Sequence, residues 1–462
     1  MLVPRSCSEE GSFDILIMHD PNFDLTFNND NFDINLEEIS KIEGAASLSI
    51  KIRNKKIEDL RFSISEWKRF YTQAVVGKPI AAVPSLLSRI CGTCSNAHLL
   101  CAIEAIEKGL SITPSPQTMI LRKLLYYGLI IRDHALHLYI FSLPDYFGKN
   151  SILDFDEKDP KEHQFLDDAF SLKEIGNKLS VIVGGRSVHA PYPTIGGFLK
   201  LPTLNQLKNL LPDLKNGREI IWRLIDFLKE NRWQEKANFP LIFSGLKSPD
   251  FSFLEGKIYT SAGQIIEEQD LRTHLEAKII PYSQARGFLF DSQYLMVGAL
   301  ARLNLSKENL HPSTKSTLGN LLSIFPSINF YDNNLAQAIE VLHAIDQSIE
   351  MIENLKAINP EIPPKITPQK TVGVGVIEAP RGTLFHQFFI NENGLIEKAE
   401  IIVPTGQNQI VMEKGICQIV ERLLKENASK EKIINEVEKF IRAFDPCMSC
   451  AAHFLKVKWR QD

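Results

Sequence analysis

The pattern of polar and apolar residues predicts strand pairs near both ends of the chain. Residues 47–52 and 60–64 alternate polar and apolar side chains, and a second strand pair is expected at residues 385–390 and 396–403. Residues 253–265 indicate a third strand region. Because alternation places every second side chain on the same face, these segments predict hairpins with one buried face.

Apolar residues at helical spacing dominate the rest of the chain. The helix expected from residue 117 follows Pro114 and Pro116, and proline is frequent where helices begin. Its apolar stretch at 124–143 includes charged residues such as Asp133, which is typical of a buried core helix and not of a membrane span. We expect an α+β, mostly helical fold: a central helix bundle with peripheral β-hairpins. The predicted helices cover residues 96–110, 117–143, 204–231, 335–357, 409–426 and 430–443.

One folded domain is expected between residues 41 and 453. Asn and Asp are frequent between residues 22 and 35, so residues 1–40 are expected to form an irregular N-terminal extension, and residues 454–462 a short tail. The first residues lack a basic segment followed by an apolar run, so we expect no signal peptide. Residues 373–378 lack the third glycine of a nucleotide-binding loop and favour a plain turn.

The composition narrows the classes of partner. The 462 residues include 52 Lys and Arg against 56 Asp and Glu, which gives a net charge of −4. This balance supplies no broad basic field for nucleic acid or an anionic membrane. With 44% hydrophobic and 23% charged residues, the chain is typical of a soluble globular protein. We therefore expect no nucleic-acid binding and no direct membrane span.

Four of the seven cysteines lie in two C-x-x-C pairs, Cys91 with Cys94 and Cys447 with Cys450. Each pair lies where a loop is expected to enter a helix, so that backbone N–H groups help to hold thiolates. Four thiolates bring four negative charges to one point. Only a soft divalent metal or a metal cluster makes that arrangement favourable.

The type of ligand alone favours a structural zinc site. The two pairs, however, are about 350 residues apart, whereas a zinc ribbon places its second pair roughly 15–20 residues after the first. Proton chemistry needs titratable neighbours and structural zinc does not, and here such residues flank the cysteines. The sequence therefore favours a buried reaction centre, with a zinc-stabilised scaffold as the alternative. The flanking residues are Arg89, His98, Asp445 and His453.

A series of short motifs follows a fixed order from residue 41 to residue 453. It begins with Ile42-Glu43-Gly44 and Arg89-Ile90-Cys91-Gly92-Thr93-Cys94. The later motifs are Asp133–Tyr139, Gly184–His189, Val297–Asn304, Glu378–His386, Val403–Thr405 and Asp445–His453. This series resembles the large, catalytic subunit of nickel–iron hydrogenases. A single C-x-x-C pair is weak evidence, but the whole series in order is specific.

The resemblance implies a Ni–Fe centre whose iron carries CO and cyanide. Cys91 and Cys447 would be terminal thiolates of nickel, while Cys94 and Cys450 would bridge nickel and iron. The family reaction is the reversible cleavage of H2 to two protons and two electrons, which needs a Lewis acid and a base. Cys447 would act as the base, and Glu43 would relay the proton outward.

The resemblance also assigns residues around the metals. Arg381, which follows Pro380, would lie over the open face of the metals with Asp133 and Asp445 as its carboxylate partners. From the residues alone, Arg381 is equally a surface salt bridge and Glu43 a capping or surface carboxylate.

Three further residues are implied near the metals. Pro404 and Thr405 would contact the cyanides by apolar packing and a hydroxyl hydrogen bond. His98 would donate a hydrogen bond to a cysteine sulfur. Without the resemblance, the first two are an ordinary strand end and His98 is a core histidine.

The sequence departs from the family pattern at three places. Ala45 stands where the family has a histidine, and Thr72 stands where many members have a glutamate. That glutamate holds magnesium together with the histidine matching His453, so a magnesium ion near His453 is doubtful here. Family precursors are cut after the same histidine, so we expect removal of residues 454–462.

The partners follow from electron transfer. The chain has no further cysteine set for iron–sulfur clusters, so the resemblance implies an iron–sulfur small subunit. Residues 294–304 look closer to cytoplasmic hydrogenases, so we expect a cytoplasmic location, with membrane association only through partner subunits. NAD(P), a deazaflavin and ferredoxin remain open as acceptors, through a diaphorase or other electron-transfer subunits. A maturation endopeptidase and nickel-insertion proteins are also implied.

Two alternatives stay within related chemistry. A hydrogen-sensing subunit would contain the same centre. The quinone-module subunit of respiratory complex I is an evolutionary cousin, but its family lacks the paired cysteines.

Overall fold

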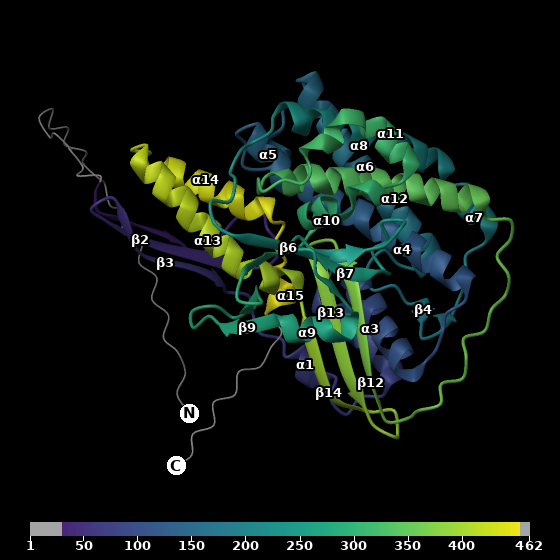
Figure 1. Cartoon of the computed structure of the whole chain (residues 1–462). Helices are drawn as coiled ribbons and strands as arrows, with labels where there is room; N and C mark the ends of the chain where they lie inside the picture. Colours follow the sequence, from purple (N-terminus) through teal and green to yellow (C-terminus); the bar gives the residue numbers. More distant parts are fainter. Residues whose placement is uncertain (1–29, 453–462) are drawn as a thin grey trace, which may run out of the picture.

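Four long helices form the central bundle of the computed structural model, which describes residues 30–452 (Figure 1). They are α4 (Pro116–Ala135), α6 (Pro160–Gly184), α8 (Leu211–Glu230) and α12 (Asp332–Asn354). Helix α4 packs against α6 and α12, and α8 packs against α12 and α6. The α+β, mostly helical fold with a central bundle is confirmed.

Ser115 caps the start of α4, and Gly176 allows α6 to lie close to α4. The Ser115 hydroxyl accepts the Thr118 N–H at the start of α4, which satisfies one of the free N–H groups of the first turn. An ideal Cβ on Gly176 of α6 would lie 2.6 Å from the backbone nitrogen of Arg132 in α4. Only glycine therefore allows α4 and α6 to approach so closely.

A three-stranded sheet lies against α3 (Ser95–Leu110), the helix that follows the first cysteine pair. The sheet is antiparallel, with β13 (Gly382–Ile390) between β12 (Thr371–Ala379) and β14 (Ile396–Ile402). An ideal Cβ on Gly373 would lie only 1.9 Å from the Ala105 carbonyl oxygen of α3. The turn expected at residues 373–378 is therefore wrong: the glycines belong to a strand that α3 covers.

The second cysteine pair follows two antiparallel helices at the C-terminal end. Helix α13 (Pro404–Lys425) packs against α14 (Lys430–Ala443), and the short α15 (Met448–Ala451) lies against α13. In Figure 1 these yellow-green helices lie beside β2 (Ala46–Arg53) and β3 (Lys56–Ile64). The two ends of the described chain therefore lie side by side.

Smaller elements complete the structure. The other strands are β1 (Phe32–Leu36), β4 (Pro193–Thr194), β5 (Gly197–Phe198), β6 (Leu241–Lys247), β7 (Lys257–Thr260), β8 (Ile265–Ile266), β9 (Leu275–Ile279), β10 (Arg286–Phe290) and β11 (Tyr294–Met296). The short helices are α1 (Tyr71–Ala74), α2 (Val83–Leu87), α5 (Leu143–Tyr146), α7 (Leu204–Lys208), α9 (Leu271–His274), α10 (Ala299–Ser306) and α11 (Pro312–Leu318). Turns of 3-10 helix lie at Ile80–Ala82, Ser88–Ile90, Ile152–Asp154, Glu268–Asp270, Lys307–Asn309 and Gly319–Ile324.

The predicted hairpins are present but belong to larger sheets. Strand β1 pairs with β2, so residues 32–36 of the expected irregular extension are regular. Strands β7 and β8 fall in the region expected at 253–265 and join β6 and β11 in a four-stranded sheet.

The predicted helices differ mainly in their boundaries. The segment expected as one helix at 117–143 is α4 followed by a π-helical turn at Leu136–Ser142. The segment at 204–231 divides into α7 and α8. Helix α6 was not predicted, although its buried residues from Phe165 to Leu179 recur at helical spacing.

Some expectations fall on residues that are not described. His453 and the tail at 454–462 lie outside residues 30–452, and so does most of the expected extension. Among the described residues, none of the helices combines the length and apolar character needed to cross a bilayer.

We expect Gly373→Ala to separate α3 from β12. The added methyl group cannot fit 1.9 Å from the Ala105 carbonyl oxygen, so the free energy of unfolding should fall by about 3 kcal/mol. Chemical denaturation measures this change. Gly197→Ala is the control, because its added Cβ would meet no atom closer than 3.4 Å and should change stability by less than about 1 kcal/mol. Equal stability of the two variants would contradict this account of the packing.

Candidate metal centre

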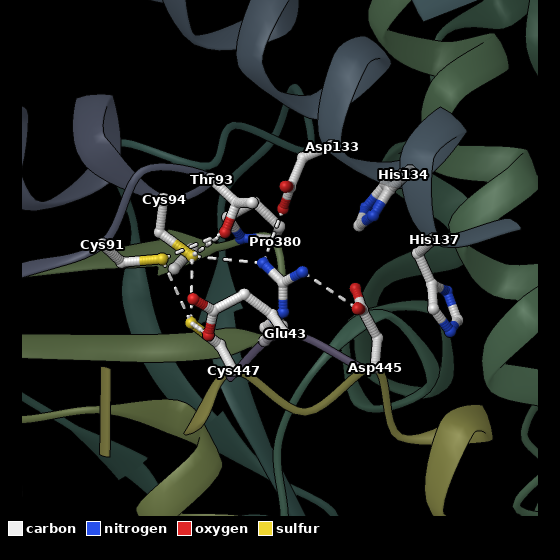
Figure 2. A network of polar contacts seen from close by, with 12 residues as sticks. Glu43, Cys91, Thr93, Cys94, Asp133, His134, His137, Pro380, Asp445 and Cys447 are labelled. Carbon is white, nitrogen blue, oxygen red and sulfur yellow. Dashed lines mark hydrogen bonds and ion pairs between the residues drawn. The ribbon is translucent and has the colours of Figure 1, made fainter. Parts of the chain in front are cut away.

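The four paired cysteines converge on one buried point. Their sulfur atoms all lie within 4.8 Å of one another, and each cysteine is at most 3% exposed. The sulfur of Cys447 lies 3.3 Å from that of Cys91 and 3.0 Å from that of Cys450. Figure 2 shows Cys91, Cys94 and Cys447 turned toward one another. The convergence expected from the sequence is present.

Both pairs lie at the beginning of a helix. Cys94 is the N-cap residue of α3, and Cys447 is the N-cap residue of α15. The two segments are joined directly, because Glu43 bridges to Cys447 and its carbonyl accepts the Met448 N–H at 3.0 Å. The segment between β1 and β2 therefore holds the C-terminal cysteine pair in place.

The protein alone cannot keep all four sulfurs ionised. Hydrogen bonds from Cys447, Cys450 and Cys94 lower the pKa of the Cys91 thiol well below its usual range. Burial raises the pKa of Cys447 and of Cys450 well above the usual range. The cluster by itself thus favours a thiolate at Cys91 and neutral thiols at Cys447 and Cys450. A soft metal ion would supply the positive charge that four thiolates require, and the donor set fits one.

Glu43 lies directly against the cysteines (Figure 2). The Cys447 thiol donates to its Oε2 at 3.0 Å, and the Ser449 N–H donates to the same oxygen at 3.1 Å. Burial raises the pKa of the Glu43 carboxyl, and the negative charge of Cys91 raises it further. This carboxyl is therefore placed to exchange a proton with the Cys447 sulfur.

Arg381 lies on another side of the cluster. Its Nη1 donates to the Cys94 sulfur at 3.1 Å and to Asp133 at 2.7 Å, while Nη2 donates to Asp445 at 2.9 Å. Burial lowers the pKa of Arg381, but the two carboxylates outweigh it, so the pKa stays well above the usual value. The Nε atom of Arg381 is buried and finds no partner within residues 30–452. A fixed positive charge with an unused donor therefore faces the cluster.

The turn before Arg381 is held by Arg302 of α10, a residue to which the sequence assigned no role. The Arg302 guanidinium is 2% exposed and binds Glu340 at 2.6 and 2.7 Å and Glu378 at 2.8 Å. It also donates to the carbonyl oxygens of Ala379 and Pro380, each at 3.0 Å. Arg302 thus fixes the backbone immediately before Arg381. In the sequence, this role could have been suspected because Arg302 and Glu340 are charged residues within apolar helical segments.

The loop that carries Cys91 and Cys94 is also held by a buried arginine. Buried Arg132 of α4 donates to the Thr93 carbonyl at 2.5 Å and to the Ser187 carbonyl at 2.6 Å. Arg132 therefore joins the Cys91–Cys94 loop to the Gly184–His189 motif. The sequence placed both segments in one series of motifs but did not predict a contact between them.

The remaining predicted residues lie around the thiols. His98 Nε2 lies 3.6 Å from the Cys450 sulfur, and its Nδ1 lies 3.2 Å from Nε2 of His386. The Thr405 hydroxyl accepts the Cys447 N–H at 2.9 Å, and Pro404 begins α13. Thr405 therefore positions the cysteine backbone, a contact that the sequence did not reveal.

Near α15 the Glu43 carboxylate accepts the Ser449 N–H, and His453, the histidine expected to hold magnesium, lies outside the described residues. Thr72 brings no carboxylate, and the Arg69 guanidinium donates to the Ser449 carbonyl at 3.2 Å. Arg286 lines the small space beside Ala451. Guanidinium groups repel a divalent cation, so we assign no role to magnesium.

The sequence matches the family described as nickel-dependent hydrogenase over residues 72–175 and 281–453. The chain is 31% identical over 427 residues to the alpha chain of sulfhydrogenase 2 from Pyrococcus furiosus, covering 92% of this chain and 100% of the relative. It is 28% identical to the alpha chain of sulfhydrogenase 1 from the same organism, covering 92% and 98%. It is also 28% identical to a chain of the F420-non-reducing hydrogenase of Methanothermobacter marburgensis, covering 92% and 96%.

Solved structures show the same fold. The structure resembles an NAD+-reducing [NiFe]-hydrogenase in the H2-reduced state with a TM-score of 0.83 at 22% identity, covering 91% of this chain and 99% of the other. It resembles the Ni-Fe-Se hydrogenase of Desulfovibrio vulgaris Hildenborough with a TM-score of 0.72 at 19% identity, covering 92% and 100%.

We expect Arg302→Met to destabilise the protein strongly. The substitution leaves Glu340 and Glu378 buried without their cation, so the free energy of unfolding should fall by about 3–5 kcal/mol. Arg53→Met is the control, because Arg53 pairs with Asp33 at the surface, where both side chains are 41% exposed, and should cost less than about 1 kcal/mol. Chemical denaturation compares the two. A loss at Arg302 no larger than that at Arg53 would show that the buried network does not hold the turn.

Proposed function

The chain belongs to the nickel-dependent hydrogenase family and is the large catalytic subunit of an enzyme that acts on H2, and we propose that its four cysteines hold a Ni–Fe centre with CO and cyanide on the iron. The observation that carries this proposal is the meeting of four buried sulfur atoms from both ends of the chain within 4.8 Å. A structural zinc scaffold does not need the titratable groups that surround them.

The cysteines have distinct roles in this proposal. Cys91 and Cys447 would hold nickel alone, and Cys94 and Cys450 would hold both nickel and iron. When bound, the centre supplies the Lewis acid and the electron acceptor for heterolytic cleavage of H2. Pro404 and Thr405 lie at the start of α13, beside Cys447, and Thr405 is our choice for the hydroxyl contact to a cyanide.

The proton leaves by way of sulfur and carboxylate. A proton held on the Cys447 sulfur moves to Glu43 Oε2 across 3.0 Å. Burial keeps the carboxyl pKa raised, so Glu43 can both accept and release this proton. The Ser449 N–H holds the receiving oxygen in line.

Arg381 organises the open side of the cluster. Asp133 and Asp445 hold its guanidinium from two directions, so the group is already oriented before a ligand binds. Its charge orients a polarisable ligand and stabilises negative charge that develops near Cys94. His98 Nε2 lies 3.6 Å from the Cys450 sulfur, and in this proposal it carries the proton, donates to that sulfur and thereby tunes its donor strength.

We further propose that the electron-accepting partner is an iron–sulfur small subunit. The remaining cysteines, Cys7, Cys101 and Cys417, supply no second ligand set. Gly92 is exposed, so the loop that binds the metals reaches the surface and allows a partner to approach closely. We also propose as partners a diaphorase or other electron-transfer subunit, nickel-insertion proteins and a maturation endopeptidase. A hydrogen sensor with the same centre is the second candidate, because sensing and turnover share these residues.

We expect Cys447→Ser to abolish H2 oxidation and H2 evolution. A hydroxyl is a much poorer ligand for nickel than a thiolate, and it cannot hold the proton in the same way. H2-dependent reduction of an artificial dye and nickel analysis measure both effects. Cys417→Ser is the control: this half-buried cysteine lies on α13 outside the cluster and should leave activity unchanged. Full activity of Cys447→Ser would remove the role assigned to Cys447.

We expect Glu43→Gln to slow proton exchange at least about a hundredfold without removing metal. Glutamine keeps the size and the Ser449 contact but cannot carry the proton. The rate of D2/H+ exchange, with nickel and iron content measured in parallel, tests this role. Glu413→Gln is a matched control, since burial also raises the pKa of Glu413 but its carboxylate accepts bonds from Phe62 and Tyr282. An unchanged exchange rate in Glu43→Gln would contradict the relay.

A further inference from the structure

A cavity of about 610 Å³ lies away from the four cysteines. It is enclosed by the second half of α3, residues 112–116, the first turns of α4, residues 254–256 and Glu268. A volume of this size is typical of sites that bind small molecules. No step of the hydrogenase reaction proposed above uses it.

The floor of this cavity is apolar. Leu100, Leu254 and Ile377 line it and are at most 6% exposed, and Met119 and Ile120 of α4 add further apolar surface. Such a lining suits hydrocarbon and gives a fully hydrated ion little to bind.

At one end of the cavity, a single lysine contacts two carboxylates. Lys108 Nζ lies 2.8 Å from Glu104 and also contacts Glu268. The two glutamate side chains are 17% and 15% exposed, so neither is well solvated. Within the described chain, Oε2 of Glu104 is buried without a hydrogen-bond partner.

At the other end a lysine also contacts two carboxylates, but these are 42% and 49% exposed, and of the two Glu255 lines the cavity. Lys123 Nζ lies 2.8 Å from Asp250 and 2.7 Å from Glu255. Between the two ends, Arg122 and Glu107 form a buried bidentate pair that is balanced by itself. Each lysine therefore contacts two carboxyl groups, one more than its single charge can balance if both are ionised.

The electrostatics of the first end support this reading. Burial raises the pKa of Glu104 to about 8 and also raises the pKa of Glu268, although Lys108 opposes both shifts. One lysine thus does not compensate for the desolvation of two carboxylates. A second positive charge at this end would stabilise both as anions.

We propose that this cavity binds an aliphatic diamine or polyamine, with one ammonium group at Glu104 and Glu268 and another at Glu255. The methylene chain would lie along Leu100, Leu254 and Ile377. Charge at two ends and hydrocarbon between them match this class of ligand and no simple inorganic cation.

A metal ion fits the cavity less well. Within residues 30–452, the cavity carboxylates do not form a group of three oxygen donors close enough to share one ion. The carboxylates at each end also already contact a lysine, which repels a divalent ion more strongly than a singly charged ammonium group.

Calorimetric titration of the purified hydrogenase complex with cadaverine tests the proposal. We expect saturable binding of one molecule per large subunit, with a dissociation constant of about 0.1–1 mM. Pentylamine, which has one charge, should bind at least about tenfold more weakly, and 1,5-pentanediol should not bind. Absence of saturable binding up to about 10 mM cadaverine, or equal binding of the diol, would overturn the proposal. Binding of Mg²⁺ that displaces cadaverine would also overturn it, in favour of a metal site.

Substitutions locate the site. Glu104→Gln and Glu255→Gln should each weaken cadaverine binding at least about tenfold, and the second lies at the more exposed end, where folding is less at risk. Glu174→Gln is the matched control. Lys178 also serves two carboxylates, Glu174 at 3.1 Å and Asp213 at 3.0 Å, but Glu174 is 64% exposed and well solvated. Unchanged affinity in both cavity variants, or an equal loss in Glu174→Gln, would contradict the assignment.

Discussion

The structure depends on four sulfur atoms that would repel one another as thiolates and yet lie within 4.8 Å in a buried place. The protein relieves this conflict only in part, by hydrogen bonds that favour one thiolate at Cys91. Arg381 adds a fixed positive charge, which Asp133 and Asp445 hold in place. The rest of the compensation falls to metal ions. The surrounding fold is therefore best understood as a frame that brings two distant cysteine pairs together and keeps water away.

That frame is built in layers around the cysteines. The segment between β1 and β2 supplies Glu43 and bridges to Cys447, while α3 and the β12–β14 sheet hold the first pair. Arg302 of α10 then fixes the turn that carries Arg381. Arg302 is a buried charged group whose guanidinium donors are all used, and such groups are costly unless the geometry is fixed.

Local patterns in the sequence predicted much of the fold and the metal centre. Helical spacing identified most of the bundle, and the two C-x-x-C pairs with their titratable neighbours pointed to one buried centre. Contacts between distant segments could not be predicted in this way. The glycines at 373 and 375 suggested a turn, because nothing local shows that α3 lies 1.9 Å from where a Cβ would stand. The roles of Arg302 and Thr405 likewise depend on partners that are remote in sequence.

X-ray absorption at the nickel edge of the purified complex tests the central claim most directly. The account predicts nickel surrounded by sulfur ligands at the distances of metal thiolates, with iron as a close neighbour. A complex that contains zinc and no nickel at the four cysteines, or nickel bound without sulfur, would contradict it.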